Sequence, residues 1–357
     1  MANTAIASIV KQLDNAVDLV VSGHSHQAYV CQLPNAAGRN VLVTSASSQG
    51  RLLTDIDLTI DPATRDVTAA VATNRLVVRN DPEVVADAAV VKLVKGYSDL
   101  IAPIANVVVG SITANVPNTR TDGACNNPAG NLIADSQLAA THPANFGGAV
   151  AAFINGGGVR DAGFAFAGSA AGEGDGNVTY REVFTVQPFG NALMVMSLTT
   201  TNIKDFLEEQ FAGCLGQAID RTRIALPSAG FSYTWDGAKT CGMRISNVTL
   251  RAGTGAGIET LVDAAGVMPN PSKTYRISVN NFMADGGDGY STLKKGTNRL
   301  GGAQDIDALT AYLSTNFKAP KAPYTPGANS NPLDAGQPRI NRVGTSANCP
   351  GGMLTNP

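Results

Sequence analysis

The sequence predicts an α/β (α+β) protein in which a small β-rich segment precedes a larger domain built on a mixed sheet. Near the N-terminus, short β-branched runs follow one another with turn residues between them, which is typical of antiparallel strands. From about Val107, similar runs alternate with segments whose apolar residues recur at helical spacing. The length of 357 residues exceeds one average core and favours two domains.

The N-terminal segment, residues 1–80, is expected to contain one helix and a small set of strands. The helix is predicted over 4–14, and a short apolar strand over 17–22 stops at Gly23. Further strands are predicted in NVLVTSAS, LLTDIDLTID and VTAAVATNRLVV. This is too little structure for a self-sufficient metal-binding domain.

A connecting helix and linker are expected over 81–106, because apolar residues at helical spacing lie between Pro82 and Pro103. The larger domain is expected over 107–343. Its helices are predicted in NLIADSQLAA, at 202–213 and in IDALTAYLSTNF, and its strands in AVAAFIN, LMVMSLT, MRISNVTL and TYRISVNNF. An irregular tail is expected over 344–357.

Composition argues against several classes of partner. With 26 basic and 28 acidic residues, nothing indicates binding to nucleic acid or to an anionic membrane surface. No apolar run reaches the ~20 residues that span a bilayer. A charged content of 15% and abundant small polar residues are typical of a periplasmic or secreted surface. The N-terminal stretch MANTAIASIV lacks the basic start of a signal peptide, so we expect an exporting segment to lie outside this chain.

Five cysteines occur without any CxxC spacing, which argues against a zinc cluster and predicts one or two disulfides in an oxidising compartment. Cys214 and Cys241 are the expected pair, because they flank about 26 residues that contain a loop. The alternative is five free thiols.

The stretch VVSGHSHQAYV places His24 and His26 on a glycine turn after the first predicted strand. A His-x-His pair at such a turn can splay toward two metal ions ~3.5–4 Å apart, as in dinuclear hydrolases. The alternative is a surface turn with two incidental histidines, and a motif of two residues leaves both open.

In FINGGGVRDAG, a predicted strand delivers Asn155 to three glycines, and Arg160 follows. Glycines let the backbone approach a ligand, and an arginine can hold a phosphate or carboxylate through two parallel hydrogen bonds. The alternative is a glycine-rich turn whose arginine pairs with Asp161.

The stretches VQPFGN and VNNFMADGGDGY place Phe189 and Phe282 beside turn residues. Two rings at the mouths of loops could clamp a planar group, although a phenylalanine beside a strand is more often part of the core. Asp288 lies on the GGDG turn, where it could bind sugar hydroxyls or hydrogen-bond its own backbone.

These motifs together resemble a known family. NLIADS, FINGGGVRDAG, VTYREVFTVQPFGN and YRISVNNFMADGGDGY occur in the order seen in the C-terminal substrate-binding domain of the 5′-nucleotidase family. GHSHQAY resembles the last metal-ligand motif of that family's N-terminal metallophosphoesterase domain. The resemblance covers roughly residues 1–343. It implies that 107–343 is the mixed-sheet C-terminal domain and that 1–80 is a remnant of the metallophosphoesterase β-sandwich.

The resemblance also implies roles for the candidate residues. Phe189 and Phe282 match the two rings that sandwich the base, and Asp288 matches a carboxylate that contacts ribose. Asn155 matches a base-side amide, and Arg160 matches a substrate-binding arginine.

Arg120, upstream of CNNPAGNLIADS, matches a second substrate arginine. His24 and His26 match one ligand for each of two divalent metal ions, such as Zn, Mn or Co. The family's remaining ligands precede the GHSH motif. We therefore expect them in sequence upstream of Met1, and we expect the chain alone to be inactive.

The resemblance thus implies part of a periplasmic or extracellular phosphoesterase that releases phosphate from nucleoside 5′-monophosphates or related nucleotides. Two alternatives stay open. The chain could be a non-catalytic module that binds nucleotides or nucleosides, or an extracellular interaction protein with a degenerate site.

Overall fold

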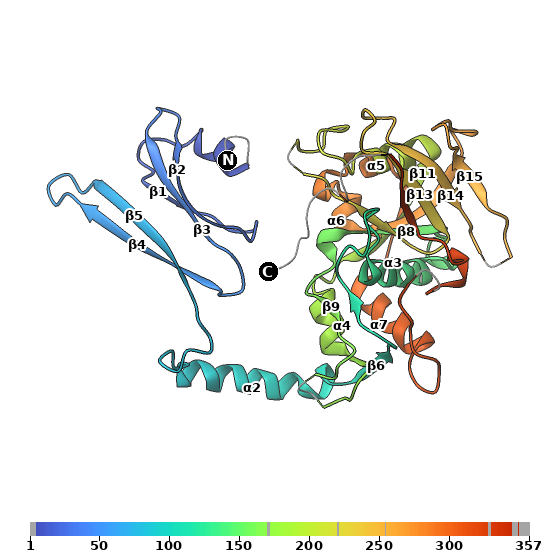
Figure 1. Ribbon diagram of the computed structural model, residues 1–357, viewed down its shortest axis with the longest axis horizontal. Coiled ribbons are helices and arrows are strands. Elements are labelled where there is room, and N and C mark those ends of the chain that lie inside the picture. Colours follow the sequence, from blue (N-terminus) through green and yellow to red (C-terminus); the bar gives the residue numbers. More distant parts are fainter. Residues whose placement is uncertain are drawn as a thin grey trace. The chain divides into compact units, whose positions relative to one another are not determined.

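The computed structural model describes residues 5–169, 172–219, 221–253, 255–327, 330–344 and 349 (Figure 1). The chain divides into two compact units, Met1–Tyr97 and Ser98–Pro357. The division falls inside helix α2 (Ala88–Ala105), which lies in the segment expected as a connecting helix. Most of the expected tail over 344–357 lies outside the described residues.

The first unit begins with helix α1 (Ala5–Val10), which ends well before the predicted end at Asp14. The helix stops because the backbone N–H groups of Gln12 and Leu13 donate to carbonyls only three residues back, as in a tighter turn. The helical prediction over 4–14 was therefore too long.

The strands of the first unit form a three-stranded sheet of order β1-β3-β2 and a separate two-stranded ribbon. Their bounds are β1 (Leu19–Val21), β2 (Ala28–Pro34), β3 (Asn40–Ala46), β4 (Leu52–Ile60) and β5 (Val67–Leu76). β1 runs parallel to β3 at the sheet edge and lies within the apolar strand expected over 17–22, although its Val21 is 70% exposed. The buried core of this unit is small and centres on Val10, Val41 and Val43.

The second unit contains the expected mixed sheet, with strand order β12-β8-β16-β11-β17. The bounds are β12 (Ala225–Pro227), β8 (Ala151–Asn155), β16 (Thr274–Asn280), β11 (Ala192–Thr199) and β17 (Thr297–Gln304). β8 and β16 are parallel and the other pairs are antiparallel. Every residue of β8 is buried, as its continuous apolar run predicts for a strand covered on both faces.

Helix α3 (Pro128–Thr141) covers one face of this sheet, and α7 (Asp305–Asn316) packs against α3 (Figure 1). Asn127 caps α3 by accepting a hydrogen bond from the Gly130 N–H, and Pro128 opens the helix. A Cβ atom on Gly130 would lie 2.0 Å from the Leu226 side chain. Only glycine therefore allows this close approach of α3 to β12.

The other face of the sheet packs on α5 (Thr200–Glu208) and on a four-stranded sheet of order β15-β14-β13-β18. Phe153 on β8 makes edge-to-face ring contacts with Phe206 and Phe231, which join these layers in one core. The bounds are β13 (Phe231–Trp235), β14 (Ile245–Leu250), β15 (Glu259–Val262) and β18 (Ile340–Arg342).

Short elements complete the second unit: β6 (Val108–Ser111) with β10 (Asn177–Thr179), β7 (Val116–Pro117) with β9 (Gly163–Phe164), and helices α4 (Tyr180–Val186) and α6 (Asn281–Ala284). Thr179 and Glu182 form a capping box that starts α4. Within the described residues, no helix combines the length and apolar character needed to cross a bilayer.

Two disulfides tie the second unit together. The predicted pair, Cys214 and Cys241, is confirmed with a Cα separation of 5.3 Å. A second bridge joins Cys125 to Cys349, also at a Cα separation of 5.3 Å, and was not predicted. Cys31, in the first unit, is a half-buried free thiol.

Candidate functional site

The candidate residues converge because of the order and direction of three neighbouring strands. β8 and β16 are parallel neighbours, so their last residues, Asn155 and Asn280, lie at the same edge of the sheet. β11 is antiparallel to β16, and the register pairs Leu193 with Asn280. The loop before β11, which carries Phe189, therefore reaches the same edge. Ligands commonly bind where the carboxyl ends of parallel strands meet.

Asn155 is buried at this edge, with 3% of its surface exposed. Its amide Nδ2 donates to Oδ2 of Asp288 at 2.7 Å, and its Oδ1 accepts from Nδ2 of Asn280 at 3.1 Å. Asn280 in turn accepts a hydrogen bond from the Met283 N–H at 2.8 Å and caps α6. A chain of amides thus links the end of β8 to the start of α6.

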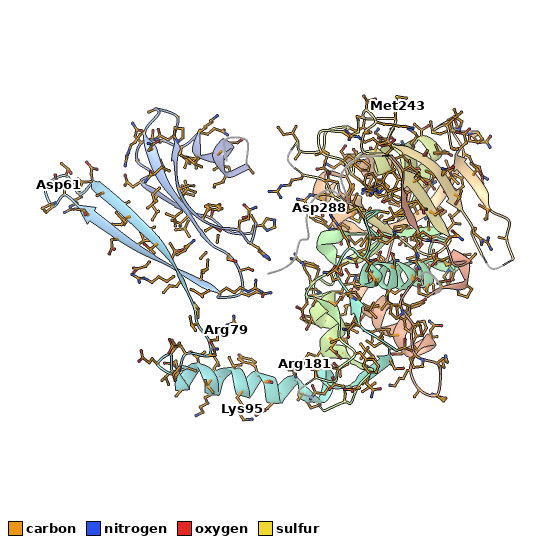
Figure 2. The ribbon with its side chains drawn as sticks, in the orientation of Figure 1. Asp61, Arg79, Lys95, Arg181, Met243 and Asp288 are labelled. Carbon is orange, nitrogen blue, oxygen red and sulfur yellow. A yellow bond between two sulfur atoms is a disulfide. The ribbon has the colours of Figure 1, made fainter. Side chains whose placement is uncertain are left out.

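Asp288 lies in the glycine-rich turn after α6 (Figure 2), with a left-handed φ of 56°. Its Oδ1 forms an ion pair with Nη1 of Arg223 at 2.9 Å, and its carbonyl oxygen accepts from Nε2 of Gln217 at 3.0 Å. The Asp288 side chain is 14% exposed. Its carboxylate therefore bonds to distant side chains, whereas the turn-chemistry alternative expected bonds to its own backbone.

Arg160 and Phe189 form a stacked pair. The guanidinium carbon of Arg160 lies 4.7 Å from the centroid of the Phe189 ring, within the range of a cation–π contact. The Arg160 N–H donates to the Val186 carbonyl at 2.7 Å, which joins the turn after β8 to the end of α4. The Arg160 Nε atom is buried without a hydrogen-bond partner. No ion pair joins Arg160 to Asp161 in the described part of the chain.

Phe189 and Phe282 are 48% and 46% exposed, so neither is a core residue. Each ring is nevertheless held on one side by the protein. Phe282 packs on the turn backbone, because a Cβ atom on Gly287 would lie 2.6 Å from its ring, and Arg160 covers Phe189. Ring contacts occur in the core, but none within the described residues joins Phe189 to Phe282.

Arg120 is half-buried in the loop between β7 and α3. Burial lowers the pKa of its guanidinium, and electrostatic interactions with Tyr233 and Tyr290 oppose this shift. Tyr290 follows Asp288 by two positions in the sequence. The electrostatic environment of Arg120 therefore includes a residue of the Asp288 turn.

His24 and His26 belong to the first unit, in the turn between β1 and β2. Both have left-handed backbones, with φ of 64° and 56°, an arrangement that histidine tolerates better than most residues. His24 is exposed and His26 half-buried. Across the described ranges, no three His, Cys, Asp or Glu side chains group closely enough to hold a metal ion. The described residues therefore do not fit a dinuclear metal centre by themselves.

Sequence reasoning missed Arg223, Gln217 and Asn280. Asn280 could have been found, because a strand followed at once by asparagine and a short helix is a capping signal. Arg223 and Gln217 carry no such signal. They lie in an irregular segment between α5 and β12 and reach Asp288 only through tertiary contacts.

Comparisons with known proteins agree with this arrangement. A family model described as "5'-nucleotidase, C-terminal domain" matches residues 108–295. The chain is 26% identical over 321 residues to Endonuclease YhcR of Bacillus subtilis (strain 168), a match that covers 89% of this chain and 22% of YhcR. It is 28% identical over 277 residues to the Trifunctional nucleotide phosphoesterase protein YfkN of the same strain, which covers 77% of this chain and 17% of YfkN. The chain thus spans about a fifth of the length of these relatives.

The fold matches the crystal structure of a 5′-nucleotidase precursor from Thermus thermophilus. The TM-score is 0.63 at 24% identity, with 96% of this chain and 62% of that chain covered. This confirms the predicted mixed α/β architecture. The family match covers more than half of the 357 residues and includes the six candidate residues from Arg120 to Asp288. The resemblance first read from the motifs is therefore confirmed, and the chain belongs to the family of the 5′-nucleotidase C-terminal domain.

Proposed function

We propose that this chain supplies the nucleoside-binding domain of a metal-dependent phosphoesterase that converts nucleoside 5′-monophosphates or related nucleotides to nucleoside and phosphate. One observation carries the proposal. At one edge of the sheet, the half-exposed rings of Phe189 and Phe282 are each covered on one side by the protein. The carboxylate of Asp288, six positions after Phe282, is held by a side chain from another segment. The name of YfkN, a nucleotide phosphoesterase, agrees with this substrate class.

Each residue has a distinct role in this proposal. A base stacks on Phe189 and Phe282, which is worth ~1–3 kcal/mol per base. The ribose hydroxyls donate to the Asp288 carboxylate, which as an ion only accepts hydrogen bonds. Arg160 and Arg120 attract the phosphate through charge-assisted hydrogen bonds.

Asn155 has a different role from the base-side amide that the resemblance implies. Both polar atoms of its side-chain amide, Nδ2 and Oδ1, already form hydrogen bonds within the protein, and only 3% of its surface is exposed. We therefore assign Asn155 to orienting Asp288 rather than to touching the base.

Hydrolysis is assigned to a larger enzyme. His24 and His26 would each contribute one imidazole to a divalent ion such as Zn, Mn or Co, and such ions would activate a water and stabilise charge on the phosphoryl oxygens. Among the described residues, no cluster of three or more His, Cys, Asp or Glu side chains completes such a centre. The proposed location is periplasmic or extracellular. Two disulfides support an oxidising compartment, and one relative is named Cell wall protein Lmo0130 of Listeria monocytogenes.

The test is calorimetric titration of the 357-residue chain with adenosine. Phe282→Ala is expected to weaken binding by about tenfold or more, without lowering the melting temperature. Phe146→Ala is the matched control, because Phe146 is 55% exposed and precedes the opposite end of β8. Equal effects of the two variants, or no adenosine binding by the unmodified chain, would contradict the proposal.

A further inference from the structure

The Asp288 carboxylate is held by side chains from two other segments. Asn155 at the end of β8 bonds Oδ2 at 2.7 Å, and Arg223 from the segment before β12 bonds Oδ1 at 2.9 Å. A third side chain, Gln217, bonds the Asp288 carbonyl at 3.0 Å. These contacts fix both the backbone and the carboxylate plane of a residue that lies on a glycine-rich turn.

The residues that hold Asp288 are themselves anchored, Gln217 through its side chain and Arg223 through its backbone. Nε2 of Gln217 also donates to the Glu209 carbonyl at 3.0 Å, and a Cβ atom on Gly289 would lie 2.5 Å from Oε1 of Gln217. Gln217 therefore packs directly on the turn. The Arg223 N–H donates to the Gln210 carbonyl at 2.7 Å, and the hydroxyl of buried Tyr290 donates to the Arg223 carbonyl at 2.5 Å.

This arrangement leaves a defined set of free acceptors. Each carboxylate oxygen can accept about two hydrogen bonds. Arg223 uses one position on Oδ1 and Asn155 uses one on Oδ2, so each oxygen keeps one further position. Two adjacent acceptors in a fixed plane match two hydroxyls on neighbouring carbons. A carboxylate that rotated freely would need to be ordered when the ligand binds, at a cost in conformational entropy.

We propose that Arg223, supported by Gln217, is a positioning residue that makes the site selective for a sugar with vicinal 2′- and 3′-hydroxyls. The proposal rests on the proposed function, because it assumes that Asp288 faces the sugar of a bound nucleoside. It extends that function by naming the feature of the ligand that is selected and the residue that enforces the selection. Arg223 acts through Asp288 and does not touch the sugar.

The experiment compares adenosine, 2′-deoxyadenosine and 3′-deoxyadenosine in calorimetric titrations of the full chain and of Arg223→Met. The unmodified chain is expected to bind adenosine about tenfold or more tightly than either deoxynucleoside, since each lacks one hydrogen bond to a charged group. Arg223→Met is expected to weaken the binding of adenosine by about tenfold and the binding of the deoxynucleosides much less. The ratio of the affinity for adenosine to the affinity for each deoxynucleoside should therefore fall toward one. Arg223→Lys, which keeps the charge but loses the planar fork, should retain part of the preference.

Two controls separate positioning from general damage. Arg221→Met removes an exposed arginine two positions away and should leave the preference unchanged. Asp288→Asn should abolish the preference as Arg223→Met does. If Arg223→Met unfolds the domain, Arg223→Lys provides the test instead. Its melting temperature shows whether it is folded, and its affinities for the three nucleosides show separately whether the preference for adenosine is reduced.

The outcomes distinguish this inference from the proposed function. If the unmodified chain does not bind adenosine, the proposed function fails and the inference fails with it. If the chain binds adenosine but does not prefer it over the deoxynucleosides, only the inference is overturned. The same holds if the Arg223 variants weaken all three ligands equally, which is the result expected of a merely structural ion pair.

Discussion

The guanidinium of Arg160 lies over the ring of Phe189, with its central carbon 4.7 Å from the ring centroid. One face of Phe189 is therefore occupied by a cation, while 48% of the residue remains exposed. The pair couples an aromatic surface suited to a base with a charge suited to a phosphate.

This coupling predicts that Arg160 discriminates between a nucleotide and its nucleoside. Arg160→Gln should weaken AMP binding by about 10- to 100-fold, because a hydrogen bond to a charged group contributes ~1.5–3 kcal/mol, and should weaken adenosine much less. Titrations with both ligands measure this. Arg181→Gln is the control, since Arg181 is exposed on α4 (Figure 2) and bonds Asn106 instead. An equal loss for both ligands would show that Arg160 supports only the ring.

The Cys214–Cys241 bridge should stabilise the second unit measurably. For a sequence separation of 27 residues, the chain-entropy model gives about 3–4 kcal/mol. Replacing both cysteines by serine should lower the free energy of unfolding by about that amount in urea titrations. Cys31→Ser, at the free thiol of the first unit, provides the control. If the double variant loses no more free energy of unfolding than Cys31→Ser, the bridge does not stabilise the folded protein.

Arg339 should be essential for stability. It is 2% exposed and pairs with Asp135 at 2.8 Å and 2.9 Å and with Asp334 at 2.9 Å. Arg339→Met leaves two buried carboxylates without their partner and should cost about 3–5 kcal/mol. Because removing both partners of a buried pair costs less than removing one, adding Asp135→Leu should restore part of the loss. Denaturation of the single and double variants tests this, and strictly additive losses would argue against the ion pair.

Asp305 should make stability depend on pH. Burial raises the pKa of its carboxyl above the usual value, although hydrogen bonds from Asn191 and the backbone oppose the shift. A raised folded-state pKa means that the folded state holds the proton more tightly. The contribution of this group to stability is then complete below the unfolded pKa of about 3.9 and is lost as pH rises through the folded value.

Asp305→Asn cannot lose that proton, so it should become relatively more stable than the unmodified chain as pH rises from about 4 to 7. Urea titrations at several pH values give the difference between the two proteins. Taking the difference removes the contribution of other groups, such as Asp334, whose pKa burial also raises. A difference that stays constant with pH would contradict the assignment.

The 357-residue chain should bind nucleosides but hydrolyse AMP very slowly. In the proposed function, His24 and His26 would supply only one imidazole to each ion, whereas a hydrolytic metal needs about three or more protein ligands. Phosphate release is measured with added Mn, Co or Zn. A turnover in the ordinary enzyme range of about 1–1,000 per second, abolished by His24→Ala, would falsify this prediction and show that the missing ligands come from a partner subunit or from other residues of the chain.

Local sequence was sufficient for the central strands and for the positions of the candidate residues along them. The apolar run AVAAFIN predicts β8, which is buried throughout, and TYRISVNNF predicts β16 and places Phe282 just beyond it. β17 was not predicted, because its sequence TNRLGGAQ is polar, contains two glycines and lacks alternation. Helix ends were also poorly predicted. α5 begins at Thr200 because Thr199 and Asn202 form a capping box, and it ends at Glu208 rather than at 213.

The sequence by itself determined the family, the strand and helix content around the site, and which side chains stand at strand ends, because those properties depend on neighbours along the chain. Only the tertiary structure decided which of them act together. The parallel pairing of β8 and β16 brings Asn155 to Asp288, and an irregular segment brings Arg223 to the same carboxylate. The bridge from Cys125 to Cys349 likewise spans 224 positions. Such contacts depend on the packing of the whole core, and no local pattern encodes which distant residue a side chain will meet.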